Sequence, residues 1–135
     1  MREQISAIAG VIGGCVAYLV GGFDSLLSVF AVILILDTAA GMIKALKNGQ
    51  YESKKFRSGI VNKLSYIIGI ILAVQIDILM GGTGILRDSI ITFFVANEAM
   101  SIIENLGEMG VVFPQIVQNA IKSLKDKSDI NSEEK

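Results

Sequence analysis

Four long apolar blocks constrain the fold of this chain more than any other feature of its sequence. They run from about Ile5 to Gly22, from Ser25 to Ile43, from Leu64 to Met80 and from Ile85 to Ile103. Each is near the lower end of the roughly 17–25 residues that a helix needs to cross about 30 Å of hydrocarbon. A soluble bundle would carry its apolar residues at helical spacing and not in continuous blocks. We therefore predict an all-α integral membrane protein with four transmembrane helices.

Short turns separate the blocks within each half of the chain. Gly21-Gly22-Phe23-Asp24 joins the first two blocks, and Gly81-Gly82-Thr83-Gly84 joins the last two. Connections this short predict two antiparallel hairpins, and residues 1–110 are predicted to form one transmembrane domain. Since three more spans follow the first block, we interpret it as a retained span and not as a cleaved signal peptide.

The basic residues predict the orientation in the membrane. Half of the twelve Lys and Arg residues lie in the middle connection: Lys44, Lys47, Lys54, Lys55, Arg57 and Lys63. The two short turns contain none. By the positive-inside rule, the middle loop and both termini are expected in the cytoplasm, with Arg87 as the exception. The simplest interpretation of the basic loop is a patch that faces lipid headgroups and fixes the topology.

A different pattern follows the fourth block. Pro114 stands at the first position of a predicted helix in which apolar residues recur at i, i+3 and i+4 spacing: Phe113, Ile116, Val117, Ala120, Ile121 and Leu124. Because this segment is too short to span, residues 111–125 are predicted to form an amphipathic helix at the membrane interface. The polar residues 126–135 are predicted to be disordered.

The residue types that most enzyme sites require are scarce. The chain has no histidine, and its single cysteine, Cys15, lies inside the first apolar block. This removes the commonest general base, the commonest metal ligand and any internal disulfide. We expect no enzyme activity and no catalytic, cofactor or metal site. The net charge of −1, with basic residues set between apolar blocks, also argues against nucleic acid as a partner.

Small residues recur four apart along the first block. Two rows result, Ser6, Gly10 and Gly14, and Gly13, Ala17 and Gly21, while Gly41 lies in the second block. Helices in lipid associate largely by close backbone approach at small residues. This small-residue face is interpreted either as a contact between copies of the chain or as a contact within one copy. Glycine is also common in membrane helices without such a role.

Three carboxylic acids lie inside the apolar blocks. Asp37 and Glu98 lie a few residues to the cytoplasmic side of the middle of the second and fourth blocks, and Asp77 lies nearer the outer end of the third. At the depth of the first two, a carboxylate costs roughly 2.5–3.5 kcal/mol on insertion scales unless it is paired, protonated or hydrated. These acids are therefore candidate functional residues.

Helical geometry places the polar residues of each span on one side. At about 100° per residue, one side of the second helix carries Asp37, Gly41, Lys44 and Asn48. On the fourth helix, one arc collects Asn97, Glu98, Ser101, Glu104, Asn105 and Glu108, with Arg87 on the same arc three turns earlier and Ile90 and Phe94 between.

This polar stripe has competing interpretations. In one, its carboxylates pair with Lys44 or Arg87 and hold the bundle together. In another, the stripe faces other copies or water and lines a lesion, with Ile90 and Phe94 as a dry constriction before opening. A proton-coupled transport site is a third interpretation.

One set of residues resembles the toxin-secretion and phage-lysis holin family of Gram-positive phages and clostridia. The similarity rests on Leu36-Asp37-Thr38-Ala39-Ala40-Gly41-Met42-Ile43-Lys44-Ala45, on Ser53, Gly59 and Lys63, on Phe94, on Asn97-Glu98-Ala99-Met100-Ser101-Ile102-Ile103-Glu104-Asn105, and on Pro114. It covers about residues 23–125. The Asn-Glu-x-x-Ser-x-x-Glu-Asn string after an Asp-x-x-x-Gly helix is its most specific part. Family members are often described with three spans, whereas this chain has four apolar blocks.

The resemblance implies a protein of the bacterial inner membrane that accumulates and then self-assembles into lesions. Its partners would be further copies of itself and membrane lipid, and a phage endolysin or a large toxin would pass without specific binding. The motif residues would be Asp37, Gly41, Lys44, Asn97, Glu98, Ser101, Glu104 and Asn105.

Two other classes of function stay open. One is a small four-span dimeric transporter or ion channel that uses Glu98 or Asp37, and the other is a non-conducting membrane scaffold.

Overall fold

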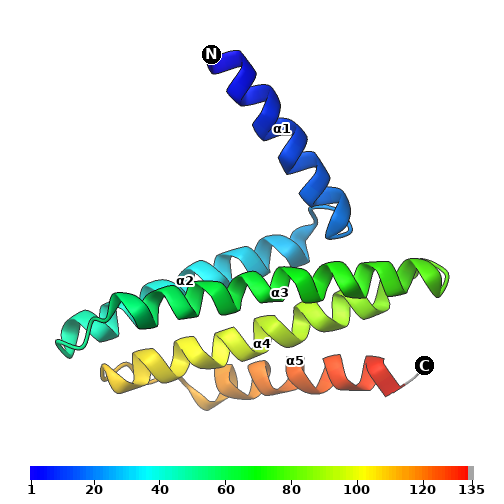
Figure 1. Ribbon diagram of the computed structural model, residues 1–135. Helices are drawn as coiled ribbons and strands as arrows, with labels where there is room; N and C mark the ends of the chain where they lie inside the picture. Colours follow the sequence, from blue (N-terminus) through cyan, green and yellow to red (C-terminus); the bar gives the residue numbers. More distant parts are fainter. Residues whose placement is uncertain (134–135) are drawn as a thin grey trace.

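The computed structural model describes residues 1–133, and the regular structure in this range is entirely helical (Figure 1). The helices are α1 (Arg2–Leu19), α2 (Ser25–Lys47), α3 (Ser53–Leu79), α4 (Ile85–Glu108) and α5 (Gln115–Glu133). This confirms the all-α prediction. By length and composition, α2 and α3 are able to cross a membrane. That α1 and α4 also span stays a prediction.

Helices α2, α3 and α4 form a three-helix bundle, with α3 antiparallel to the other two (Figure 1). Its core contains Ile70 and Ile91, which are almost fully buried, together with Val20, Leu27, Phe30, Val74 and Val95. Gly69 lies where α3 packs on α4, and a Cβ atom there would be at van der Waals distance, 3.5 Å, from Ile90 and Phe94. The α3–α4 hairpin predicted from the glycine-rich turn is therefore present.

The outer surface of the bundle is apolar. Val32 and Ile35 of α2, and Ile68 and Leu72 of α3, are more than half exposed. Soluble monomers rarely expose contiguous apolar surface of this kind. The burial pattern, a packed inner face and an apolar outer face, thus suits a bundle surrounded by lipid or by other copies of the chain.

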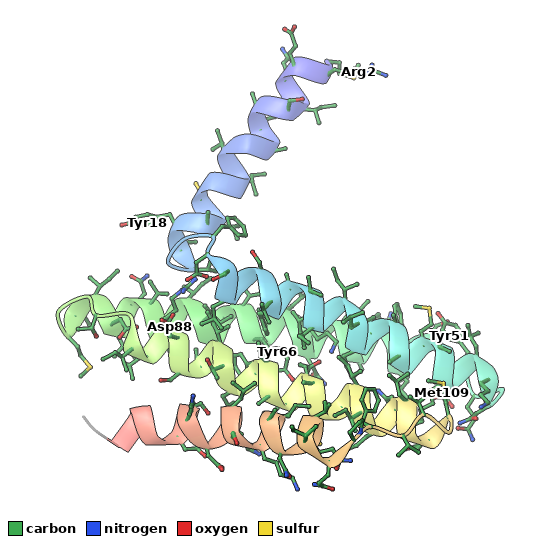
Figure 2. The ribbon with its side chains drawn as sticks, turned by 180° about the vertical axis from the view of Figure 1, so that it is seen from behind. Arg2, Tyr18, Tyr51, Tyr66, Asp88 and Met109 are labelled. Carbon is green, nitrogen blue, oxygen red and sulfur yellow. The ribbon has the colours of Figure 1, made fainter. Side chains whose placement is uncertain are left out.

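Helix α1 does not fold back on α2, and the first predicted hairpin is absent. It projects away from the bundle (Figure 1), and none of its residues is buried. Tyr18 near its end also points away from the bundle (Figure 2). The cause lies in the connection, where Gly21 and Gly22 adopt positive φ values and Asp24 is extended. This turn is held by α4, so α4 sets the direction of α1.

Helix α5 runs antiparallel along α4 and returns the chain toward the end where α4 begins (Figure 1). Lys125 lies over the ring of Phe93 with its Nζ atom 5.5 Å from the centroid, and Ser128 is buried. These contacts keep the segment helical, so the tail predicted to be disordered from residue 126 is helical to Glu133. Residues 134 and 135 lie outside the described range.

Candidate functional site

A buried ionic cluster joins α2, α3 and α4 in the cytoplasmic half predicted for the bundle. The Lys63 ammonium donates to Asp37 Oδ2 at 2.7 Å and also to Glu98 Oε2. The Tyr66 hydroxyl donates to Glu98 Oε1 at 2.7 Å. The side chains of Lys63, Asp37 and Glu98 are 18%, 13% and 9% exposed. Both candidate carboxylates of the spans are therefore paired within one chain.

A second group of polar residues extends this cluster toward the end of the bundle that is predicted to be cytoplasmic. Asn105 donates weakly to Asp37 Oδ1 at 3.5 Å and accepts from Lys44 Nζ at 3.4 Å. Lys44 also forms a 2.7 Å ion pair with Glu108. Gly41 lies beside this group, where an added Cβ would make an ordinary van der Waals contact of 3.8 Å with Asn105 Nδ2.

This ionic cluster is not electrically balanced. When ionised, Lys63 and Lys44 supply two positive charges, whereas Asp37, Glu98 and Glu108 supply three negative charges. Breaking one member of a buried pair leaves an uncompensated charge and typically costs 3–5 kcal/mol. These ion pairs thus hold α2, α3 and α4 together at this point only while their members stay paired.

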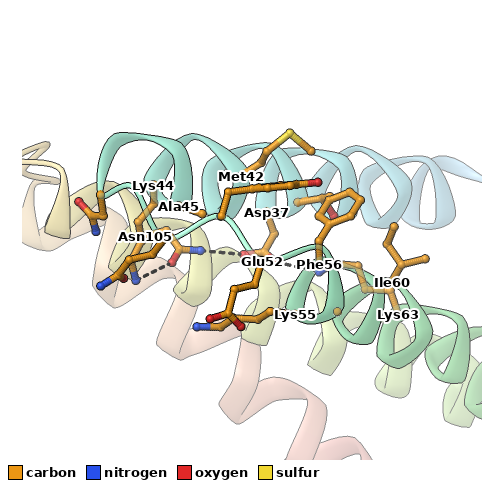
Figure 3. Close-up of a pocket in the computed structure, with 16 residues that line it drawn as sticks. Asp37, Met42, Lys44, Ala45, Glu52, Lys55, Phe56, Ile60, Lys63 and Asn105 are labelled. Atoms are coloured by element: carbon orange, nitrogen blue, oxygen red, sulfur yellow. Dashed lines mark hydrogen bonds and ion pairs between the residues drawn. The ribbon is translucent and has the colours of Figure 1, made fainter.

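A cavity of about 260 Å³ opens beside the cluster, between α2 and the start of α3 (Figure 3). Asp37, Lys44 and Lys63 line its polar side, and Met42 and Phe56 line its apolar side. The described residues contain no group of three or more His, Cys, Asp or Glu side chains able to hold a metal ion.

Arg87 forms a second polar site at the opposite end of the bundle. All five of its N–H groups donate: Nε to Val20 O at 2.6 Å, Nη1 to Asp24 Oδ2 at 2.7 Å and Asp88 Oδ1 at 3.0 Å, and Nη2 to Gly22 O at 3.0 Å and Asp24 Oδ1 at 3.2 Å. This Arg87 clamp ties the α1–α2 turn to α4. It pairs Arg87 with Asp24 and not with the acids of the polar stripe.

The clamp explains two features of the turn. Hydrogen bonds from Arg87 hold the pKa of the Asp24 carboxyl below its usual range, and the Leu27 amide, which donates to Oδ1 at 2.9 Å, acts in the same direction. Position 21 must be glycine, because its φ is +81° and a Cβ atom would lie 2.8 Å from Arg87 Nε. Gly21 therefore contacts α4 and takes no part in helix packing along α1.

Asp77 binds backbone amides at the start of α4, next to the α3–α4 turn. It is 3% exposed, and its carboxylate accepts from the backbone amides of Leu86 at 3.1 Å and Arg87 at 2.8 Å. A carboxylate at this position satisfies amides at the start of α4 that have no partner within the helix. Asp77, the acid nearer the outer end of the third apolar block, is thus a buried helix cap.

The remaining candidates of the fourth span fall into two groups. Ile90 and Phe94 lie inside the bundle, where Phe94 stacks on Tyr66 at a centroid distance of 4.4 Å, so their role as a constriction stays a prediction. Ser101 interacts with Asp37. Asn97 is partly buried, while Glu104 is exposed.

The small-residue face of α1 has no neighbour within the described chain at its glycines. Cβ atoms added to Gly10, Gly13 or Gly14 would meet nothing within 4 Å, and Ser6 is exposed, whereas Ala17 is partly buried near the α1–α2 turn. From Ser6 to Gly14, the glycines of this face therefore have no contact within one copy, whereas Gly21 contacts Arg87. Its role in contacts between copies stays a prediction.

The residue that sequence reasoning missed is Lys63, which was assigned to the basic loop. One signal pointed to it: Lys63 precedes Tyr66 by three positions and Ile70 by seven, so it shares the buried face of α3. The predicted span began at Leu64, whereas α3 begins at Ser53, eleven residues earlier. Lys63 was therefore placed outside the span and its position on the buried face of the helix was overlooked.

Comparison with known proteins gives a consistent result. Residues 14–126 match the bacteriophage holin family. The probable holin of Bacillus phage phi105 is 32% identical over 117 residues, which cover 87% of this chain and 86% of that protein. An uncharacterized protein of Listeria monocytogenes is 33% identical over 121 residues, covering 90% and 86% of the two chains. A further relative, an uncharacterized 14.9 kDa protein of Clostridium perfringens, is 32% identical over 117 residues, covering 86% and 89%. No solved structure matches.

Proposed function

Because the chain belongs to the bacteriophage holin family, we propose that it self-associates in the bacterial cytoplasmic membrane and forms lesions that release a large cytoplasmic protein. The observation that carries this proposal is the family match over residues 14–126, supported by the identity to a probable phage holin. Holins are not an enzyme family. The released protein would be an endolysin or a toxin, and it would pass without specific binding.

The unpartnered helix α1 supports self-association. Its apolar side chains are exposed, and its glycines meet no other part of the described chain. In lipid, a small-residue face lowers the free energy mainly by packing closely on another helix. A second copy supplies such a helix, so the arm formed by α1 is proposed as a contact between protomers.

The ionic cluster supports a closed state that is able to open. Within one copy, Lys63 and Tyr66 satisfy Asp37 and Glu98. In the proposed closed state, the exposed apolar side chains of α2 and α3 would face lipid. When copies accumulate, rearrangement of these polar groups toward water would convert a dry assembly into an opening. The proposed topology has four spans, with the middle loop and both termini in the cytoplasm.

The test is release of a fluorescent protein from cells that express this chain alone, recorded beside a small membrane-impermeant dye. A holin releases both, with abrupt onset. Entry of the dye without release of the protein would contradict the proposal and indicate the transporter or channel class. An unchanged membrane potential would indicate a scaffold.

The transporter class is less favoured, because Lys63 already occupies both carboxylates that a substrate cation would use.

A further inference from the structure

An open cavity of about 340 Å³ lies on α4 between α3 and α5, which flank α4 on either side (Figure 1). Small residues line much of this α4 groove, namely Gly69 and Ala73 of α3 and Ser89 of α4, and the ring of Phe93 lies beside them. Ser89 is only 8% exposed. Among the described residues, its Oγ is the one buried side-chain polar atom with no hydrogen-bond partner. The groove therefore offers both close backbone approach and an unused hydroxyl group to a neighbouring helix.

Two polar residues continue the line of the α4 groove toward the end of the bundle that is predicted to be cytoplasmic. At 100° per residue, Phe93, Asn97 and Glu104 lie about 40°, 80° and 60° around α4 from Ser89, so they share one side of the helix. Within the described part of the chain, the side chains of Asn97 and Glu104 make no hydrogen bond or ion pair. Polar groups on a spanning helix are stabilised by partners on other helices. This side of α4 therefore lacks a partner that one copy does not supply.

Helix α1 carries complementary residues on one side. Arg2, Ser6, Gly10 and Gly14 are four positions apart, so this side has a cation at its start and glycines toward its end. Arg2 lies at the far end of the projecting helix (Figure 2), and no residue of α1 is buried. Ser6 Oγ donates to Arg2 O, which leaves its lone pairs free to accept. The side offers a cation to a carboxylate, an acceptor to an amide and open space to a ring.

The two sets of residues also match in depth. Leu19 ends α1 and Ile85 begins α4 at the same end of the bundle, because Arg87 ties the α1–α2 turn to α4. At 1.5 Å per residue, the distances from Leu19 are about 25.5, 19.5, 13.5 and 7.5 Å for Arg2, Ser6, Gly10 and Gly14. The distances from Ile85 are about 28.5, 18, 12 and 6 Å for Glu104, Asn97, Phe93 and Ser89. When both helices span the membrane, each residue thus lies within about 3 Å of the depth of its counterpart.

We propose, resting on the self-association and four-span topology proposed above, that the α4 groove of one copy binds α1 of the next copy. Arg2 pairs with Glu104 of the neighbouring copy, and Asn97 of that copy donates to the Ser6 hydroxyl. Gly10 gives room to the ring of Phe93. The Ser89 hydroxyl lies against Gly14, where no side chain covers the backbone carbonyls. This contact uses the bundle as it stands, with the ionic cluster intact and α5 on α4.

The first test is a disulfide between two copies of the full chain with Cys15→Ala. One copy carries Ser6→Cys, and a co-expressed copy with a tag of different size carries Asn97→Cys. In the matched control the second copy carries Leu36→Cys, because Leu36 is 49% exposed on α2 and lies at a similar depth, about 16.5 Å from Ser25. After oxidation of the membranes, we expect the mixed disulfide dimer of the Ser6 and Asn97 variants to exceed that of the control at least several-fold.

Equal yields of the two mixed dimers, or a larger yield of the control, would overturn the proposal. Either result leaves the proposed function standing, because release of the fluorescent protein by the parent chain is recorded in the same cells. Failure of the parent chain to release protein would refute the proposed function itself.

A charge exchange tests the contact without cysteines. Arg2→Glu alone and Glu104→Arg alone bring like charges together, so each should lower protein release at least several-fold at equal expression. Combining Arg2→Glu with Glu104→Arg restores opposite charges and should recover the release of the parent chain. Lys54→Glu with Glu104→Arg is the matched control, because Lys54 is exposed near the start of α3, and it should stay as low as Glu104→Arg. A combined Arg2 and Glu104 variant that releases no more than the single variants would contradict the pairing.

Discussion

The ammonium group of Lys63 lies 2.7 Å from Asp37 Oδ2, although the two residues are 26 positions apart and belong to different helices. The same ammonium donates to Glu98 on a third helix. One cation thus connects all three helices of the bundle. Because the contact is largely buried, removing the cation would leave two carboxylates without their partner.

Replacement of Lys63 by methionine should destabilise the bundle strongly. The change keeps the length of the side chain but leaves Asp37 and Glu98 buried without their cation. We expect a loss of about 3–5 kcal/mol in the free energy of unfolding, measured by denaturation in detergent micelles. Lys54→Met, at an exposed position, is the matched control and should change stability by less than about 0.5 kcal/mol.

The same variant offers a rescue experiment. Adding Asp37→Asn and Glu98→Gln to Lys63→Met removes the two unpaired charges, so much of the lost stability should return. Should the triple variant be as unstable as Lys63→Met alone, the cost would come from packing and not from charge.

Glu98→Gln should advance lesion formation. Glu98 accepts from Tyr66 through one carboxylate oxygen and from Lys63 through the other, whereas glutamine offers one oxygen and turns its NH2 group toward the remaining donor. We expect the closed bundle to lose about 1–3 kcal/mol, with an earlier onset of protein release at equal expression. Glu52→Gln, at an exposed position before α3, is the control. Identical timing of Glu98→Gln and the parent chain would refute a role for the polar stripe.

The Arg87 clamp should weaken in acid. The pKa of Asp24 is lowered in the folded chain, so its stabilising effect is complete above the usual carboxyl pKa of about 3.9 and is lost as pH falls through the lowered value. The protection of the backbone amides in residues 20–24 against hydrogen exchange, taken relative to the intrinsic rate at each pH, should therefore fall in strong acid.

Asp24→Asn isolates the charge of the clamp, since asparagine caps a helix about as well as aspartate. This variant should exchange faster in residues 20–24 at neutral pH and lose much of the acid dependence. Asp88→Asn is the comparison, because Asp88 makes one contact with Arg87 whereas Asp24 makes two. An unchanged pH dependence in Asp24→Asn would assign the effect to another group.

Gly10→Leu with Gly14→Leu should weaken contacts between copies without disturbing the fold of one copy. Cβ atoms at both positions have open space, so the free energy of unfolding should change by less than about 0.5 kcal/mol. Cross-linking in membranes should give shorter ladders. Ile8→Leu with Ile12→Leu, on the opposite side of α1, should keep them; equal ladders from the two pairs would exclude the small-residue face as an interface.

Much of the fold follows from local sequence signals. The α3–α4 hairpin and the helix after Pro114 were predicted because glycine-rich turns and apolar spacing act locally. The direction of α1 was not predictable in this way. It depends on Arg87, which reaches back across more than sixty residues to Val20 and Asp24.

The candidate site was predicted in part. Asp37 and Glu98 were identified because an acid in an apolar block is costly wherever it points. Their cation was not, because Lys63 lies within a run of basic residues whose topogenic role already explains them. The role of Asp77 as a cap for α4 depends on how α3 and α4 approach each other. The spacing of apolar residues along the sequence carries no information on that approach.

The turn between α1 and α2, which connects α1 to the bundle, would influence the shape of any assembly of copies. An arm that packs on a different surface of the next copy makes a heterologous interface, which repeats until it closes into a ring or continues as an open row. The rotation per copy is then fixed by the angle at Gly21, where the guanidinium of Arg87 leaves no room for a side chain. This one glycine would govern the circumference of the assembly.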